Sequence, residues 1–219
     1  MKNSRVQEKY YNEGWFGRHP EIYDRTDFFM KLIRSRAAQK LRLDQPQLIL
    51  DVATGTGSQG FEFVKLGHTV VGIDLDIEML KKATRKNKGG LKLSFIHGDG
   101  TKLCFLSKTF DVAVISFAMH DVPYSIGIEI LLEAKRIIKD FGTIYIVDYE
   151  EPGNNFSAKI LHSVALIYES PNYKHFIRRG LEDYLKPAGL ALSRKENIVF
   201  GALQLVSLKK ANYINPENS

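Results

Sequence analysis

Short apolar runs alternate with helix-period segments between residues 47 and 148. These runs, one of them alternating apolar with polar, lie at 48–50, 70–73, 91–97, 110–116 and 143–147. Central strands of a parallel sheet are buried on both faces and are apolar throughout, whereas the helices that cover them repeat apolar residues every three or four positions. The pattern predicts an α/β fold, a doubly wound and mostly parallel sheet with helices on both faces.

Further elements are predicted on both sides of this core. Before it, helical spacing predicts a surface helix with its apolar residues at Phe29, Leu32, Ile33, Ala37 and Leu41. After it, two helical patterns follow, the second extending from Phe176 to Leu185. Residues 190–198 and 203–210 predict two more strands, so that an antiparallel hairpin completes a seven-stranded sheet.

Residues 48–74 carry the clearest binding motif. An apolar run ends at Asp51, Gly55 and Gly57 follow in a turn, and a helical pattern leads to a run that ends at Asp74. The glycines let a ligand approach the main chain, and the helix N-terminus points unpaired N–H groups at the same place. The stretch predicts a βαβ unit that binds the adenosine half of a cofactor, with Asp74 on the ribose hydroxyls.

Two kinds of cofactor fit this unit. Gly55, Gly57 and Gly60 spell the G-x-G-x-x-G of dinucleotide-binding enzymes, and Asp74 follows at about the right distance. Asp51, however, places a carboxylate directly before the turn. That charge would repel a pyrophosphate and attract a ligand that carries an ammonium and a sulfonium group.

Four motifs together resemble those of a known family. They are L-D-V-A-T-G-T-G at 50–57, G-I-D at 72–74, G-D at 98–99 and F-D-V-A-V-I-S at 110–116. Their order and spacing are similar to those of the Rossmann-like (class I) S-adenosylmethionine-dependent methyltransferases. The branch that contains the ubiquinone and menaquinone methyltransferases looks nearest, and Tyr23-Asp24 resembles a Y-D pair that precedes its core.

The resemblance implies S-adenosylmethionine as the cofactor and assigns contacts to it. Asp99, the acid of the G-D pair, would face the adenine amino group, and Asp51 and Asp74 would keep the roles derived above. The remaining residues expected to contact the cofactor are Tyr23, Ala53, Thr54, Gly55, Gly57, Leu75, Met79, Gly100, Ser116 and Phe117.

His120 is the candidate catalytic residue. It follows the fourth predicted strand, and in open α/β sheets ligands bind at the carboxyl ends of the strands. Methyl transfer from a sulfonium is an in-line displacement, and a histidine that titrates near neutrality suits removal of a proton from the acceptor. Asp148 and Tyr149, at the end of the next strand, are weaker candidates.

The absence of two sequence motifs limits which classes of methyl acceptor the sequence favours. The loop after residue 116 lacks the N-P-P-Y type of sequence found in amino-group nucleic-acid methyltransferases, and no Pro-Cys nucleophile follows. Asp121, Asp148 and either Asn154 or Asn155 could be assembled into a catechol-type metal site, but their spacing does not favour one. We therefore expect a small-molecule methyl acceptor and no metal.

Composition adds limits to this interpretation. The 219 residues suffice for one well-packed domain, and a single cysteine, Cys104, is expected to be a small core residue rather than half of a disulfide. We find no apolar stretch that could span a bilayer and expect a cytoplasmic protein, a monomer or a homodimer.

The net charge of +6 derives partly from the basic run 81–88, which is interpreted as a solvated helix face. Nucleic acid remains a possible partner that is not favoured.

The sequence thus predicts a single methyltransferase domain acting on a small, partly apolar acceptor. Its parts are a helical cap at 1–45, a cofactor-binding core at 46–148, a helical substrate-side segment at 149–187, a hairpin at 188–210 and a frayed tail at 211–219. Three alternatives stay open: an RNA or protein methyltransferase that uses the basic surface, a nicotinamide-dependent oxidoreductase, and a non-catalytic member of the fold that binds cofactor or a partner protein.

Overall fold

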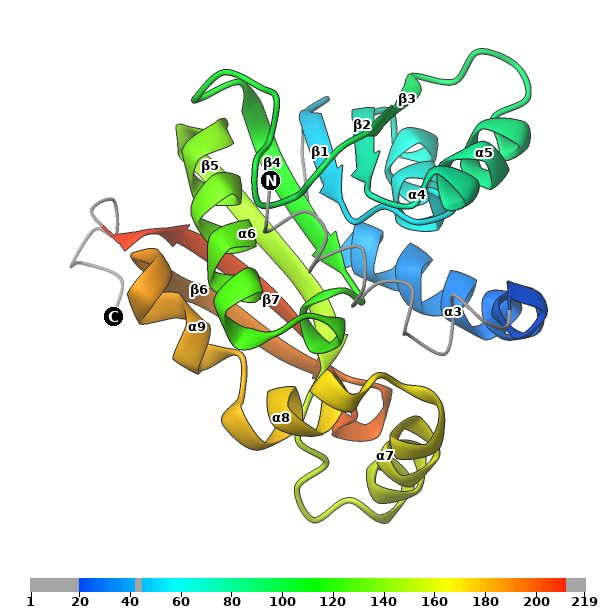
Figure 1. The fold of residues 1–219 in the computed structure, drawn as a ribbon, viewed down its shortest axis with the longest axis vertical. Helices are drawn as coiled ribbons and strands as arrows, with labels where there is room; N and C mark the ends of the chain where they lie inside the picture. Colours follow the sequence, from blue (N-terminus) through cyan, green and yellow to red (C-terminus); the bar gives the residue numbers. More distant parts are fainter. Residues whose placement is uncertain (1–19, 42–44, 212–219) are drawn as a thin grey trace.

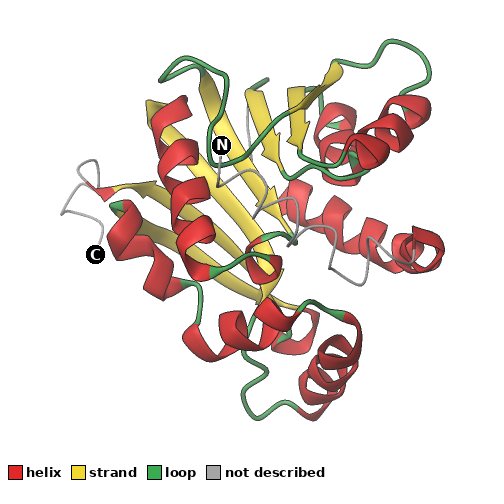
Figure 2. Cartoon of the chain, viewed as in Figure 1, coloured by secondary structure: helices red, strands yellow, loops and turns green. Residues whose placement is uncertain are grey.

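A computed structural model of the chain describes residues 20–41 and 45–211, without the side chains of residues 20–29 and of residue 168. One continuous sheet runs through it, with helices on both faces (Figure 1, Figure 2). The predicted cap residues 1–19 and tail residues 212–219 lie outside the described residues. The division of the chain into five segments therefore stays a prediction.

The sheet has seven strands in the order β3-β2-β1-β4-β5-β7-β6. β1 to β5 pair in parallel, while β7 runs antiparallel to both β5 and β6. The strands are β1 (Leu48–Val52), β2 (Thr69–Asp74), β3 (Leu93–His97), β4 (Phe110–Ser116), β5 (Ile138–Tyr149), β6 (Leu190–Ile198) and β7 (Leu203–Lys210). The predicted fold class is confirmed.

Alternate residues of the central strands fill two separate cores. Val112 and Val114 of β4 face a core shared with α3 (Pro20–Lys40) and α4 (Ser58–Lys65). Ala113 and Ile115 face the opposite core, which α6 (Tyr124–Ile137), α8 (Pro171–Arg179) and α9 (Glu182–Ala188) cover. Since successive side chains of a strand point to opposite faces, a strand covered by helices on both sides must be apolar at nearly every position.

The switch in strand order lies between β1 and β4. From β1, the chain builds outward to β2 and β3 and then returns to place β4 on the other side. Helices α5 (Ile77–Lys86) and α4 lie on the β2–β3 side, whereas α7 (Phe156–Tyr168) and α8 lie beyond the carboxyl ends of β4 and β5 (Figure 1). Such a switch point opens a crevice at the carboxyl ends of the strands.

Three local predictions were wrong. The predicted helix through Phe176 and Leu185 is two helices, α8 and α9, because Gly180 between them has φ 78° and ψ 154°, which no helix allows. β5 begins at Ile138, directly after α6, and not after Gly142; Lys139, Asp140 and Phe141 are exposed or half-buried, so the first part of the strand has no continuous apolar run. Cys104 is exposed, because its neighbour Leu103 fills the core instead.

The described helices contain no membrane-spanning candidate. None within residues 20–41 and 45–211 combines the length and the apolar character needed to cross a bilayer.

Gly180 should be more sensitive to substitution than Gly153, another glycine with positive φ. Its φ and ψ lie in a region that only glycine populates, so Gly180→Ala should lower the free energy of unfolding by about 1–3 kcal/mol. Gly153, with φ 50° and open space around its Cα, is the matched control and should lose less when changed to alanine. Denaturant titrations of both variants measure the difference; equal losses would contradict it.

Candidate functional site

The chain reverses sharply between β1 and α4. Ala53, Gly55 and Gly57 all have positive φ, at 54°, 55° and 74°. A Cβ on Gly57 would come within 2.7 Å of the Phe95 ring, and one on Gly72 of β2 would come within 2.8 Å of Thr54. The turn therefore needs glycine at position 57 for its backbone conformation, and β2 needs glycine at position 72 because the turn packs closely against it.

Asp51 is a buried carboxylate with one oxygen unused. It is 1% exposed; its Oδ2 accepts a hydrogen bond of 2.6 Å from the Thr54 hydroxyl, while its Oδ1 is buried and has no hydrogen-bond partner. Burial raises the pKa of Asp51 to about 6, although the Thr54 hydroxyl and the nearby Arg34 guanidinium lower it. A buried acceptor without a donor is costly, so this position calls for a ligand that brings one.

Asp74 ends β2 beside the same turn. Its Oδ2 accepts a hydrogen bond of 2.6 Å from the Gly55 N–H, and its Oδ1 accepts one of 2.8 Å from the Asp76 N–H. Burial raises its pKa to about 6 as well. Each carboxylate oxygen has a second lone pair, so these backbone contacts orient Asp74 without using up its capacity to accept hydrogen bonds from a ribose.

The other predicted contacts on the β2–β3 side lie nearby. The Met79 N–H donates to Asp76, which caps α5 as predicted, and the Leu75 carbonyl lies 2.9 Å from Nε2 of His97. Asp99 follows β3 and accepts hydrogen bonds on Oδ1 from the Thr101 N–H and hydroxyl, which hold its side chain in place. A Cβ on Gly100 would come within 3.1 Å of Val52, so the G-D loop packs directly against β1.

Ser116 is the last residue of β4, and Phe117 follows it; β4 lies beside β1, on the side away from β2. Phe117 has φ 54°, the second strand end with a strained non-glycine residue, after Ala53. Two residues that the sequence did not suggest meet here: the Ser116 hydroxyl lies 3.4 Å from the side-chain oxygen of Gln59, and the Arg34 guanidinium lies 5.9 Å from the Phe117 ring. Gln59 and Arg34 are both buried, on α4 and α3.

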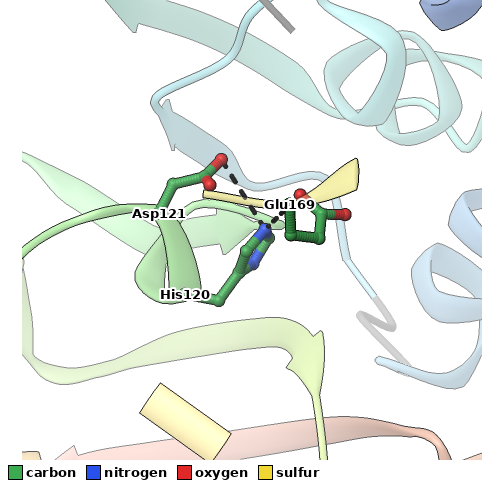
Figure 3. A group of neighbouring side chains, drawn as sticks. All are labelled: His120, Asp121 and Glu169. Carbon is green, nitrogen blue, oxygen red and sulfur yellow. Dashed lines mark hydrogen bonds and ion pairs between the residues drawn. The ribbon is translucent and has the colours of Figure 1, made fainter. Parts of the chain in front are cut away.

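His120 lies just beyond, in the 3₁₀ turn η1 (Met119–Asp121), and is 2% exposed. Its Nδ1 is 2.6 Å from Asp148 Oδ1 at the end of β5. Its Nε2 is 3.3 Å from Glu169 Oε2 and 3.6 Å from Asp121 Oδ2 (Figure 3). With Asp148, three carboxylates face one imidazole.

The neighbouring carboxylates decide the charge of His120. Burial alone would lower its pKa, but Asp148, Asp121 and Glu169 outweigh burial and raise the pKa well above 6.5. The imidazole is therefore held in its protonated form in this arrangement. Both ring nitrogens of His120 already face carboxylates. His120 can therefore contact a methyl acceptor only if the side chain of Glu169 or Asp121 moves aside.

Aromatic rings surround this polar cluster. The Tyr149 ring packs edge-on against His120 at 4.8 Å and against Phe117 at 6.0 Å, and its hydroxyl donates to Glu169 Oε1 over 2.6 Å. Tyr173 of α8 lies 4.8 Å from Tyr149. Phe117 and Tyr149 thus connect the cofactor crevice to the cluster around His120.

Some predicted site residues are brought together and others are not. Asp121 and Asp148 both contact His120, but on its two different ring nitrogens, and Asn155 caps α7 by accepting the Ala158 N–H instead of joining them. Glu169, which directly follows α7, takes that place and was missed because nothing in its local sequence marks it. Tyr23 lies in α3, in the part whose side chains are not described.

Comparisons with known proteins agree with this geometry. A methyltransferase-domain family matches residues 49–142. The demethylmenaquinone methyltransferase of Renibacterium salmoninarum is 30% identical over 135 residues, 59% of this chain and 55% of that protein. The enzyme of that name from Tropheryma whipplei is 25% identical over 213 residues, 87% of each chain. The chain spans about half the length of the first curated relatives it matches.

Solved structures support the fold. An S-adenosylmethionine-dependent methyltransferase of Thermotoga maritima superposes with a TM-score of 0.67 at 20% identity, over 90% of this chain and 98% of that one. One from Aquifex aeolicus gives a TM-score of 0.64 at 22% identity, over 80% and 88%. With the motifs and the strand order, these findings show a methyltransferase domain at residues 49–142, in a chain that has the Rossmann-like fold of S-adenosylmethionine-dependent methyltransferases.

Proposed function

We propose that this chain transfers a methyl group from S-adenosylmethionine to a small, partly apolar acceptor that carries an acidic hydroxyl, of the hydroquinone type. The observation that carries the proposal is the pairing of two features at one strand edge. A buried carboxylate with one unsatisfied oxygen lies near the end of β1 beside the glycine turn, and a cluster of ionisable groups among aromatic rings lies at the ends of β4 and β5.

The residues of the crevice fit the cofactor. The ammonium group of its methionine part would supply the donor that Asp51 Oδ1 lacks, and Arg34, buried beside Asp51, is placed to hold the carboxylate. Asp74 and Asp99 keep the ribose and adenine contacts assigned from the sequence. A dinucleotide would instead bring a pyrophosphate toward Asp51, which argues against the oxidoreductase alternative.

The chain's own residues then have a limited task. When bound, the cofactor supplies a methyl group on a sulfonium that is already a good leaving group. Phe117 and Tyr149 can hold an aromatic acceptor in line with that methyl group and exclude water between the crevice and the cluster. Alignment of this kind can contribute on the order of 7–11 kcal/mol to the barrier in the best cases.

The acceptor's proton is the remaining requirement. A hydroxylated ring reacts more readily as its anion, and the cluster of His120, Asp121, Asp148 and Glu169 is the group of titratable side chains beside Phe117 and Tyr149. A hydroquinone presents both a flat apolar ring and an acidic hydroxyl. Relatives named demethylmenaquinone methyltransferase support this class of acceptor.

The basic run on α5 supports the alternative of a macromolecular acceptor less well. α5 packs against β3 and β2, toward one edge of the sheet, whereas the His120 cluster lies at the ends of β4 and β5 (Figure 1). Within the run, Lys81 already pairs with Glu78. An RNA bound along α5 would therefore not present its methylated atom to the cluster without extending across the crevice.

Asp51→Asn should weaken cofactor binding and stabilise the fold. Loss of a charge-assisted hydrogen bond of about 1.5–3 kcal/mol should raise the Kd for S-adenosylmethionine about 10- to 100-fold. The folded-state pKa of about 6 exceeds the ordinary 3.8, so ionised Asp51 destabilises the protein above pH 6. The variant should therefore gain about 1–3 kcal/mol at pH 8, and this gain should shrink as the pH falls toward 4. Calorimetry and denaturant titration measure the two effects.

Asp111→Asn is the matched control. Hydrogen bonds from Lys139 and from the Leu48 N–H outweigh burial and lower the pKa of Asp111, so its removal should cost stability at pH 8 and leave cofactor binding unchanged. If Asp51→Asn binds the cofactor as tightly as the wild type, Asp51 does not contact the ammonium group.

A demethylated naphthohydroquinone should gain one methylene unit in mass when incubated with the chain and S-adenosylmethionine. His120→Gln should lower the turnover by roughly 10²- to 10⁴-fold, the usual contribution of acid–base groups, while changing cofactor affinity little. Mass spectrometry of the acceptor and calorimetry of the cofactor provide the readouts. Methylation of RNA with no methylation of hydroxylated rings would instead favour the macromolecular alternative, and an unaffected rate in His120→Gln would reduce that residue to packing.

A further inference from the structure

The His120 cluster has the donor atoms of a metal site. Nε2 of His120, a carboxylate oxygen of Asp121 and one of Glu169 all lie within 4.8 Å of one another, and in Figure 3 the three side chains point to a common centre. They come from two elements distant in sequence, the turn η1 and the residue after α7. The fold therefore assembles the group, and no local sequence motif does.

The spacing suits a small divalent cation. A tetrahedral ion with bonds of about 2.1 Å keeps its ligand atoms about 3.4 Å apart. The distances from His120 Nε2 are 3.3 Å to Glu169 Oε2 and 3.6 Å to Asp121 Oδ2. The third pair, the carboxylate oxygens of Asp121 and Glu169, lies within 4.8 Å, so a bound ion would draw these two carboxylates closer together.

In His120 and Glu169, the polar atom that would face away from a bound ion already makes a hydrogen bond. Asp148, which is 0% exposed, fixes Nδ1 of His120 and so directs Nε2 toward the carboxylates. The Tyr149 hydroxyl fixes Oε1 of Glu169 and leaves Oε2 facing the imidazole. Metal-binding histidines almost always donate their other ring N–H to a carboxylate, a backbone carbonyl or water, and ligating carboxylates are hydrogen-bonded in turn.

The charges around His120 also call for a cation. Asp121, Asp148 and Glu169 face a single imidazole, and no lysine or arginine of the described ranges forms an ion pair with any of the three. The Ser170 hydroxyl provides a separate observation: Ser170 directly follows Glu169 in the chain, and its hydroxyl oxygen is buried and has no hydrogen-bond partner. An unpaired buried hydroxyl beside such a cluster marks a place for a polar ligand.

We propose that His120, Asp121 and Glu169 bind a divalent first-row transition-metal ion such as Zn²⁺, at the acceptor side of the crevice. One imidazole and two carboxylates suit such ions better than Mg²⁺ or Ca²⁺, which prefer oxygen ligands only. The Asp121 side chain is 38% exposed, against 7% for Glu169 and 3% for His120, so the open coordination position faces outward, toward an incoming acceptor.

The inference deepens the proposed function and rests on it for the ion's use. A bound ion would coordinate the hydroxyl oxygen of the acceptor and lower the pKa of that hydroxyl, as metal ions do for bound water. His120 would lose its Nε2 proton to solvent as the ion binds and would then act as a ligand, and the acceptor's proton would leave to solvent or to the outer oxygen of Asp121.

Zn²⁺ titration of the full chain, first stripped with a chelator, tests the site without cofactor or acceptor. Wild type should bind one ion, and Asp121→Asn and Glu169→Gln should each weaken Zn²⁺ at least about tenfold, since even outer partners of metal ligands contribute 10- to 100-fold. Glu169→Gln retains an acceptor for the Tyr149 hydroxyl, which protects the fold. Asp183→Asn, an exposed acid on α9, is the matched control and should bind as wild type.

Visible absorption of bound Co²⁺ gives a second readout, because its band intensity reports a four-coordinate site. No Zn²⁺ binding by wild type, or equal binding by the Asp121→Asn/Glu169→Gln double variant, would overturn the proposal. Either result would leave methyl transfer untouched, and failure of every acceptor would leave Zn²⁺ binding untouched, so the two proposals fail separately.

Discussion

Buried negative charge at the carboxyl ends of the strands constrains this structure more than any other feature. Asp74 is the last residue of β2, Asp51 and Asp148 are the second-last residues of β1 and β5, and each is at most 2% exposed. Buried carboxylates are costly unless paired, and the raised pKa values of Asp51 and Asp74 measure that cost. A fold that keeps such groups where ligands bind is arranged to receive positive charge, from a cofactor on one side and, by our inference, from a metal ion on the other.

Hydrogen bonds and core packing hold these three carboxylates in place. Backbone N–H groups of the turn and of α5 hold Asp74, Thr54 holds one oxygen of Asp51, and Asp148 is held between His120 and the η1 backbone. Two cores, one on each face of the sheet, fix the strand ends from which these groups extend. Strained conformations at Ala53 and Phe117 occur at the two strand ends that border the crevice, where such strain commonly has a functional reason.

The sequence predicted the fold, including the βαβ unit that carries the expected cofactor residues, because the determinants of these elements are local. Apolar periodicity located the core strands, and Asp51, Gly55, Gly57 and Asp74 occur at fixed spacing within one βαβ unit. The acceptor side was not predictable in this way. Glu169, Arg34 and Gln59 reach the site through tertiary packing, and the break at Gly180 depends on a backbone conformation that periodicity does not register.

Calorimetry of the wild-type chain with S-adenosylmethionine, its demethylated product and a nicotinamide dinucleotide tests the central claim most directly. The demethylated product shares the ammonium, ribose and adenine groups with the cofactor, whereas the dinucleotide would bring a pyrophosphate to Asp51. Our account predicts that the first two bind and that the dinucleotide does not. Binding of the dinucleotide, with no heat from either adenosyl ligand, would contradict it.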